Sequence, residues 1–187
     1  MIHHMKIYPD HIDLEREFNK LDHLILDFVA LIPTEYVIVS GYVAILLGRS
    51  RGSEDIDIIL PTMDEDAFLK MVRGLKDFYC LNTKDPNGIY PHLAAGIPVR
   101  FAKTGTVIPN VEVKFAQKGI ARRALKDRIP VSASGKTLYI SPLELQIAYK
   151  EQMLKSEKDR EDALHLREIA KDVLDQGALG RYEAMLK

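Results

Sequence analysis

The sequence lacks several features that would assign it at once to a class of protein. It has a single cysteine, Cys80, so an internal disulfide is excluded. Its apolar runs fall well short of the ~20 residues that a membrane helix needs. No secretion signal is visible at the start. We therefore expect a cytoplasmic protein that does not interact with a membrane.

An excess of charge of either sign is also missing. The 26 basic and 27 acidic residues give a formal net charge of −1. A basic surface covering the whole chain, as nucleic-acid binding often uses, is therefore excluded, and any polyanion site must be local. The 187 residues are 47% hydrophobic and 28% charged, which is typical of a globular protein with a core.

The apolar pattern predicts an α+β (α/β) fold in which helices flank a mixed β-sheet. Apolar residues spaced by three and four predict a first helix over 10–32. Short β-branched or alternating runs predict strands at 36–39, 56–60, 97–102 and 111–115, and a hairpin over 129–140. Residues 83–91 are expected to form a loop.

The motif Ser-Pro-Leu-Glu at 141–144 predicts the start of a helical region. Serine would cap the helix, proline would take its first position, and glutamate would complete a capping box. A second capping box is expected at 62–65. We therefore predict an α/β domain over 1–140 and a C-terminal helical region over 141–187.

Asp55 and Asp57 are the most informative pair in the sequence. Side chains alternate along a strand, so both aspartates should point to one face, about 6.6 Å apart along the chain. Two carboxylates at this spacing can ligate one divalent ion, or two ions about 3.5–4 Å apart. Mg²⁺ prefers such oxygen ligands. The alternative is that both aspartates simply lie on a solvated strand face.

The residues before this pair favour phosphate binding. Ser40 and Gly41 lie between a predicted strand and a predicted helix, where backbone N–H groups and a hydroxyl can bind phosphate. Arg49 and Arg51 follow in the loop that leads to the aspartates, and their guanidinium groups could hold a triphosphate.

A third carboxylate is expected on a neighbouring strand. Alternation along 111–115 places Glu112 and Lys114 on one face, which makes Glu112 the candidate. Asp64 and Asp66 are rivals, but acids are expected there anyway because the segment begins a predicted helix.

On these motifs the sequence resembles the nucleotidyltransferase superfamily of the DNA polymerase beta type. Within that superfamily it is most similar to the AbiEii-like and minimal-nucleotidyltransferase-like proteins of toxin–antitoxin systems. The resemblance is carried by Ser-Gly-Tyr-Val-Ala at 40–44, Arg-Gly-Ser-Glu-Asp-Ile-Asp at 51–57, Ser-Pro-Leu-Glu-Leu at 141–145 and Lys-Asp-Arg-Glu-Asp at 158–162. The family's usual glycine-rich turn has Ser40 here, and its usual third aspartate is Glu112.

The resemblance implies a role for each matching residue. Asp55, Asp57 and Glu112 would ligate Mg²⁺, with Mn²⁺ as a substitute. The nucleotide would be bound by Ser40, Gly41, Arg49, Arg51 and Ser53. Lys150 and Asp159 would complete the catalytic set from the helical region, which is expected to pack over the active-site cleft.

The implied reaction transfers a nucleoside monophosphate from a nucleoside triphosphate to tRNA or to a protein. In a toxin–antitoxin system the protein would be a toxin or an antitoxin, and its partner would be the cognate antitoxin or toxin. One alternative is transfer to a small molecule, as in aminoglycoside-modifying relatives. Another is an inactive nucleotide-binding or protein-binding module of the same fold.

A local basic stripe is the candidate RNA contact. Its residues are spaced so that a helix over 117–126 would present them together: Lys118, Arg122, Arg123 and Lys126. They could bind RNA phosphates, although a solvated helix face explains the same pattern.

Overall fold

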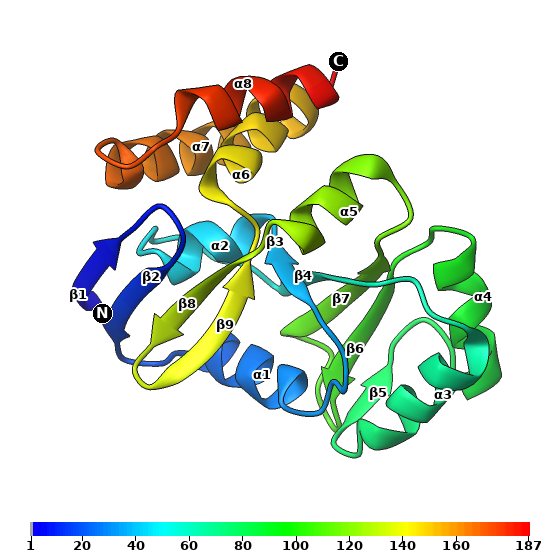
Figure 1. The fold of residues 1–187 in the computed structure, drawn as a ribbon. Coiled ribbons are helices and arrows are strands. Elements are labelled where there is room, and N and C mark those ends of the chain that lie inside the picture. The colour runs from blue at the N-terminus through cyan, green and yellow to red at the C-terminus, as the bar shows by residue number, and fades with distance from the viewer. Residues whose placement is uncertain (1) are drawn as a thin grey trace. The chain divides into compact units, whose positions relative to one another are not determined.

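The computed structural model describes residues 2–187 and shows the mixed α+β fold that the sequence predicts (Figure 1). The chain divides into two compact units. Unit 1 comprises residues 1–17, 38–51 and 126–187, and unit 2 comprises residues 18–37 and 52–125. Within 2–187, no helix is both long and apolar enough to cross a membrane.

Unit 1 contains the strand order β1-β2-β8-β9-β3. β1 and β2 are antiparallel, as are β8 and β9, whereas β2 pairs with β8 and β3 with β9 in parallel. The strands are β1 (Ile2–Ile7), β2 (Ile12–Arg16), β3 (Val37–Val39, of which residue 37 belongs to unit 2), β8 (Ile129–Ala133) and β9 (Lys136–Ile140).

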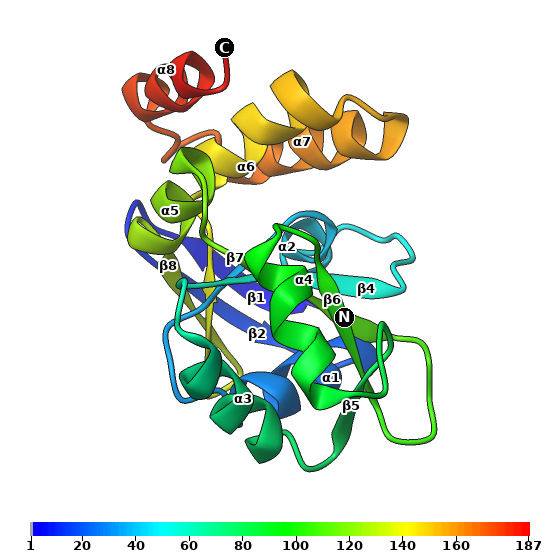
Figure 2. The same ribbon diagram turned by 90° about the vertical axis from the view of Figure 1, so that its right-hand side faces the viewer.

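The helices of unit 1 include the C-terminal helical region. α6, α7 and α8 lie together in both ribbon views (Figures 1 and 2). The elements are α2 (Gly41–Leu46), α6 (Leu143–Tyr149), the π-helical turn η2 (Lys150–Leu154), α7 (Glu157–Ala170) and α8 (Gln176–Met185). This helical region belongs to the same compact unit as β1, β2, β8 and β9. The boundary between the two units therefore does not fall at residue 141, where the sequence predicts a domain boundary.

Unit 2 contains the strand order β4-β7-β6-β5. β4 and β7 are parallel, and the other neighbours are antiparallel. The strands are β4 (Asp55–Leu60), β5 (Phe78–Cys80), β6 (Val99–Lys103) and β7 (Asn110–Phe115). The helices are α1 (Lys20–Val29), α3 (Glu65–Gly74), the 3₁₀ turn η1 (Pro86–Gly88), α4 (Ile89–Ala94) and α5 (Gly119–Lys126).

Aromatic rings fill the core of unit 2. Phe28 on α1 packs edge-on against Phe78 of β5, with ring centroids 5.0 Å apart. On α3, Phe68 packs edge-on against Phe115 of β7 at 5.6 Å. Such edge-to-face pairs stabilise a core beyond the area that they bury. These contacts fix α1 against β5 and α3 against β7, the strand that carries Glu112.

The predicted helix over 10–32 is wrong in its first part. Residues 12–16 form β2, and the helix begins only at Lys20, capped by Asn19. Ile12 and Leu14 are buried while Asp13 and Glu15 are more exposed, which is the alternation of a strand. Pairing with β1 and β8 therefore determines the structure of this segment, and the helical spacing there was fortuitous.

Both predicted capping boxes are wrong. α6 begins at Leu143 with Pro142 as its cap, and the buried Ser141 hydroxyl accepts a hydrogen bond from Gln146 instead. α3 is capped by Asp64, two residues later than expected. The expected loop over 83–91 also contains η1 and the first turn of α4.

Candidate functional site

An acidic row crosses the neighbouring strands of unit 2. Along β4, Ile56 and Ile58 are fully buried, whereas Asp55 and Asp57 are partly exposed on the opposite face. The parallel register places Asp57 beside Glu112 of β7. The three predicted carboxylates therefore lie on one face of two adjacent strands, as alternation along each strand predicts.

Glu112 is held by two cations of the same unit. The Lys114 Nζ donates to Glu112 Oε1 at 2.7 Å and to Asp57 Oδ1 at 2.8 Å. Arg100 lies opposite Glu112 on β6, and its Nε and Nη2 donate to Glu112 Oε2 at 3.0 and 2.8 Å. Both oxygens of Glu112 are thus occupied, and Lys114 links the two carboxylates.

The charges of this row shift one another's pKa. Burial raises the pKa of Asp57, and the nearby Glu112 and Asp55 charges raise it further, against the opposing effect of Lys114. Burial also raises the pKa of Glu112, but hydrogen bonds from Lys114 and Arg100 outweigh it and keep that pKa below its usual value. Of Asp57 and Glu112, Asp57 is therefore the one whose negative charge is less well compensated.

Two further side chains adjoin Asp55. The Ser53 hydroxyl donates to the Asp55 backbone oxygen at 3.0 Å and lies 3.3 Å from its carboxylate. Ser53, predicted to bind nucleotide, thus contacts the first aspartate. In the parallel register Asp55 pairs with Asn110, which is 6% exposed. The Asn110 Oδ1 is buried and accepts no hydrogen bond from any residue within 2–187.

The donor set of this row fits a magnesium ion. No group of three His, Cys, Asp or Glu side chains within residues 2–187 is arranged to hold a metal. Mg²⁺, however, is usually bound by one or two carboxylates together with phosphate oxygens and water. Asp55 and Asp57 supply two carboxylates, and a buried oxygen without a donor at Asn110 is the kind of group that a bound ion would satisfy.

Unit 1 contains the predicted phosphate-binding residues. Ser40 connects β3 to α2 with φ 67° and ψ −141°, a conformation that favours glycine. The Arg51 guanidinium packs directly against Gly41, where a Cβ would lie 2.9 Å from Arg51 Cζ. The Arg51 Nε is buried, lies 3.7 Å from Asp162 Oδ1, and donates no hydrogen bond within the described residues.

A buried charge cluster in unit 1 contains the other predicted residues. Lys150, 1% exposed, donates to Asp162 at 2.8 Å and to Asp159 at 3.2 Å. Arg49 forms ion pairs with Asp162 and Glu161 of α7. Because Asp162 is fully buried, it depends on these cations for compensation. Arg49 and Lys150 are thus engaged within the protein, and Asp162, to which the motif at 158–162 gave no role, is a central residue of the cluster.

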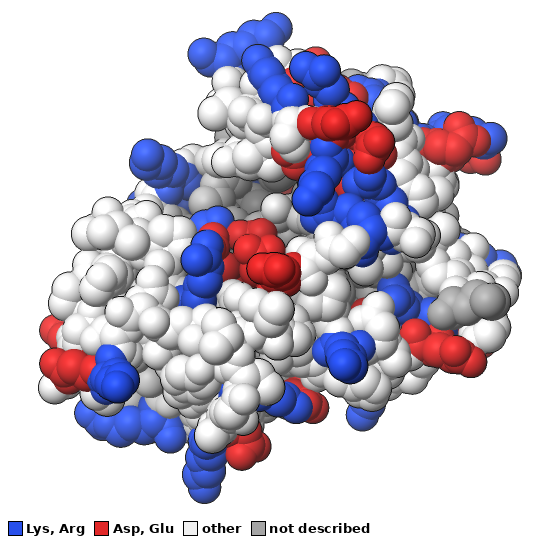
Figure 3. Space-filling view, turned by 180° about the vertical axis from the view of Figure 1, so that it is seen from behind, with Lys and Arg blue, Asp and Glu red and all other residues white. Residues whose placement is uncertain are grey.

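The predicted basic stripe follows α5. Lys118 precedes the helix, and all four basic side chains are exposed. The Arg122 Nε donates to the Ala116 carbonyl at 3.2 Å, which ties one of them to the backbone. On the face seen in Figure 3, basic and acidic side chains are interspersed, in keeping with the small net charge.

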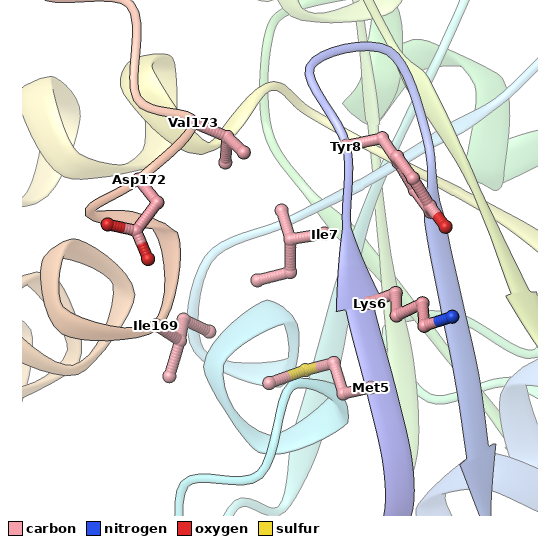
Figure 4. A pocket seen from close by; sticks show the side chains of 7 residues that line it. All are labelled: Met5, Lys6, Ile7, Tyr8, Ile169, Asp172 and Val173. Atoms are coloured by element: carbon pink, nitrogen blue, oxygen red, sulfur yellow. The ribbon is translucent and has the colours of Figure 1, made fainter.

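Two pockets in unit 1 are lined by none of the residues predicted for the site. One, of about 300 Å³, is bordered by β1 and by the end of α7 and the residues that follow it (Figure 4). Met5 and Ile7 face Ile169 and Val173 across it, whereas Lys6 and Tyr8 lie on the other side of the strand. A second, of about 430 Å³, is lined by residues of β1, β2 and the β8–β9 hairpin. Neither lining includes a carboxylate of the acidic row.

Known proteins that resemble this chain are found among solved structures. No protein-family model matches the chain, and no curated protein matches it. Among solved structures, the chain is similar to the crystal structure of an antigenic nucleotidyltransferase-like protein from Paracoccidioides brasiliensis. The two share 16% sequence identity with a TM-score of 0.49, over 78% of this chain and 72% of that chain.

Proposed function

We propose that this chain is a magnesium-dependent nucleotidyltransferase that transfers a nucleoside monophosphate from a nucleoside triphosphate to a macromolecular acceptor. The observation that carries the proposal is the acidic row, in which Asp57 lies beside Glu112 in register and shares one strand face with Asp55. The motif resemblance around residues 40–60 supports the same chemistry.

Asp55 and Asp57 would hold the magnesium ion. Ser53 keeps the Asp55 carboxylate oriented through its hydrogen bonds, and the β4–β7 register places Asp57 beside Glu112. The ion would supply charge neutralisation for the phosphate oxygens and for the departing pyrophosphate. Catalysis of this kind depends mainly on positioning and on electrostatic stabilisation, because the phosphoryl group needs little covalent assistance.

Arg51, Ser40 and Gly41 would bind phosphate oxygens. The buried Arg51 Nε lacks an acceptor among the described residues, and guanidinium groups bind phosphate through paired hydrogen bonds. Lys150, Asp159 and Arg49 would act indirectly, because the ion pairs that Lys150 and Arg49 form with Asp159 and other acids of α7 fix the chain near Arg51. The acceptor would be a tRNA or a partner protein, with the exposed basic side chains of α5 as the RNA contact.

The test is transfer of label from α-labelled nucleoside triphosphates with Mg²⁺, supplied with total cell RNA and with lysate. The wild-type chain should label an acceptor, and Asp57→Asn should lose at least about a hundredfold in rate. Asp64→Asn is the matched control, because asparagine caps α3 as well as aspartate does. Absence of transfer by the wild-type chain with every triphosphate would refute the proposal.

A non-catalytic nucleotide-binding module is the second candidate. It is favoured by the ion pairs that occupy both oxygens of Glu112, the residue on which a third metal ligand was expected. Calorimetry separates the two candidates, because this one predicts triphosphate binding without turnover.

A further inference from the structure

Asn110 and Glu112 differ sharply in how well their side-chain oxygens are satisfied. Both lie on the same face of β7, two residues apart, and each pairs in register with one aspartate of β4. Glu112 accepts hydrogen bonds on both oxygens, from Lys114 and Arg100. Asn110 Oδ1 accepts none within residues 2–187, although the residue is 6% exposed.

A buried amide oxygen that accepts no hydrogen bond costs the folded state about 1–3 kcal/mol. A ligand that contacts this oxygen would remove the cost. The Asn110 Nδ2 lies 3.4 Å from the Glu54 carbonyl, and the backbone N of Asn110 donates to the same oxygen. These contacts anchor the residue beside the segment that leads into Asp55 and leave its oxygen available. Carbonyl oxygens of Asn are good ligands for hard divalent cations.

The charge balance gives the same result. The three carboxylates of the row carry −3, and Lys114 and Arg100 carry +2, which leaves −1. Glu112 is therefore neutralised by resident cations, and a divalent ion that used it would first have to displace Lys114 or Arg100. At Asp57, by contrast, Lys114 contacts Oδ1. Asp55, whose carboxylate contacts only a hydroxyl in the described residues, has no such competitor.

We propose that Asn110, and not Glu112, supplies the third protein oxygen of the divalent-cation site, together with Asp55 and Asp57. Lys114 and Arg100 neutralise Glu112 and keep it out of the coordination of the ion. This inference rests on the proposed magnesium dependence and specifies which residues of the chain produce it. It also predicts one divalent ion bound per chain in the absence of nucleotide.

The experiment measures Mn²⁺ binding to the full chain by electron paramagnetic resonance titration. Two changes that preserve net charge are compared: Asn110→Ala, and the double variant Glu112→Gln/Lys114→Met. Asn110→Ala should weaken Mn²⁺ binding about tenfold, which corresponds to about 1.4 kcal/mol. The double variant should leave the dissociation constant within about threefold of wild type, a difference below 1 kcal/mol.

Asn110→Asp provides a second test that does not depend on Asn110→Ala folding normally. It keeps the oxygen and adds a charge, so it should bind Mn²⁺ more tightly than wild type. It should also show a larger rise in melting temperature when Mn²⁺ is added, because a ligand stabilises the folded state in proportion to its affinity.

The outcomes separate this inference from the proposed function. If the wild-type chain binds Mn²⁺ and only the Glu112/Lys114 double variant weakens it, the assignment of Asn110 is overturned while the metal site stands. Two ions per wild-type chain would overturn the assignment in the same way. If neither the wild-type chain nor Asn110→Asp binds Mn²⁺, both the assignment and the magnesium-dependent function fail.

Discussion

Removal of the Asp162 charge should strongly destabilise the protein. Asp162 is fully buried and accepts hydrogen bonds from Lys150 and Arg49, and Lys150 is itself only 1% exposed. Loss of one member of such a buried pair typically costs about 3–5 kcal/mol, because the other charge stays buried without compensation. Asp159 still faces Lys150, and Glu161 still faces Arg49. We therefore expect Asp162→Asn to lower the free energy of unfolding by about 3 kcal/mol, near the lower end of this range.

The assay is thermal and urea unfolding followed by far-ultraviolet circular dichroism. For a chain of this length, about 3 kcal/mol should lower the melting temperature by roughly 6–12 °C. The control is Lys171→Met, which removes the exposed Lys171–Glu168 pair at the end of α7 and should leave the melting temperature almost unchanged. The double variant Lys150→Met/Asp162→Leu should recover about half of the loss, because it buries no unpaired charge from this pair.

The reasoning would be refuted if Asp162→Asn were no more destabilising than the Lys171 control. It would also be refuted if the double variant were less stable than the single one, since the cost would then come from packing and not from an uncompensated charge.

Three further predictions concern single features of the chain. Ser40→Gly should raise the free energy of unfolding by about 1 kcal/mol, because glycine relieves the positive φ; Ser40→Ala, which keeps a Cβ, should not. Changing Lys118, Arg122 and Arg123 together to Glu should abolish RNA binding in a low-salt filter assay, and unchanged affinity would exclude that surface. Burial raises the pKa of Asp159, but hydrogen bonds from Ser156 and Lys150 outweigh it and lower the pKa. The resulting stabilisation is present above the unfolded pKa of about 3.9 and is lost as the pH falls through the lower folded value. The stability difference between wild type and Asp159→Asn in urea should therefore shrink as the pH falls below about 4.

The sequence predicted best those segments whose structure depends on local pattern. Alternation placed Asp55, Asp57 and Glu112 on common strand faces, and the hairpin over 129–140 was expected from its turn. Pattern failed at residues 12–16, because the same apolar spacing suits a helix or a strand. Pairing with β1 just before this segment and with β8 more than one hundred residues later determined the result. Ser141 likewise matched a capping motif, but its burial committed the hydroxyl to Gln146.

Within the candidate site, the sequence could supply residue types but not their partners. Glu112 was predicted as a metal ligand because it is an acid on the same strand face as the aspartates. In the structure, however, it forms ion pairs with Arg100, its partner in the β6–β7 register, and with Lys114. Asn110 was missed, although it shares the face of Glu112 two residues earlier. Its significance lies in an oxygen that no other described group satisfies, and only three-dimensional coordinates can show that.

The hydrophobic core of unit 2 is what sets the register of this acidic row. Val111 and Val113 are fully buried on the opposite face of β7, as Ile56 and Ile58 are on β4. Because side chains alternate with a period of two, a slip of one residue between these strands would place a valine beside Asp57 and bury Glu112 in the core. Burial of the Glu112 carboxylate in the core without a cation would be far more costly than the loss of one surface ion pair. The apolar residues therefore exclude the alternative register. The positions of Asn110 beside Asp55 and of Glu112 beside Asp57 follow from apolar packing on the opposite, buried face of the two strands.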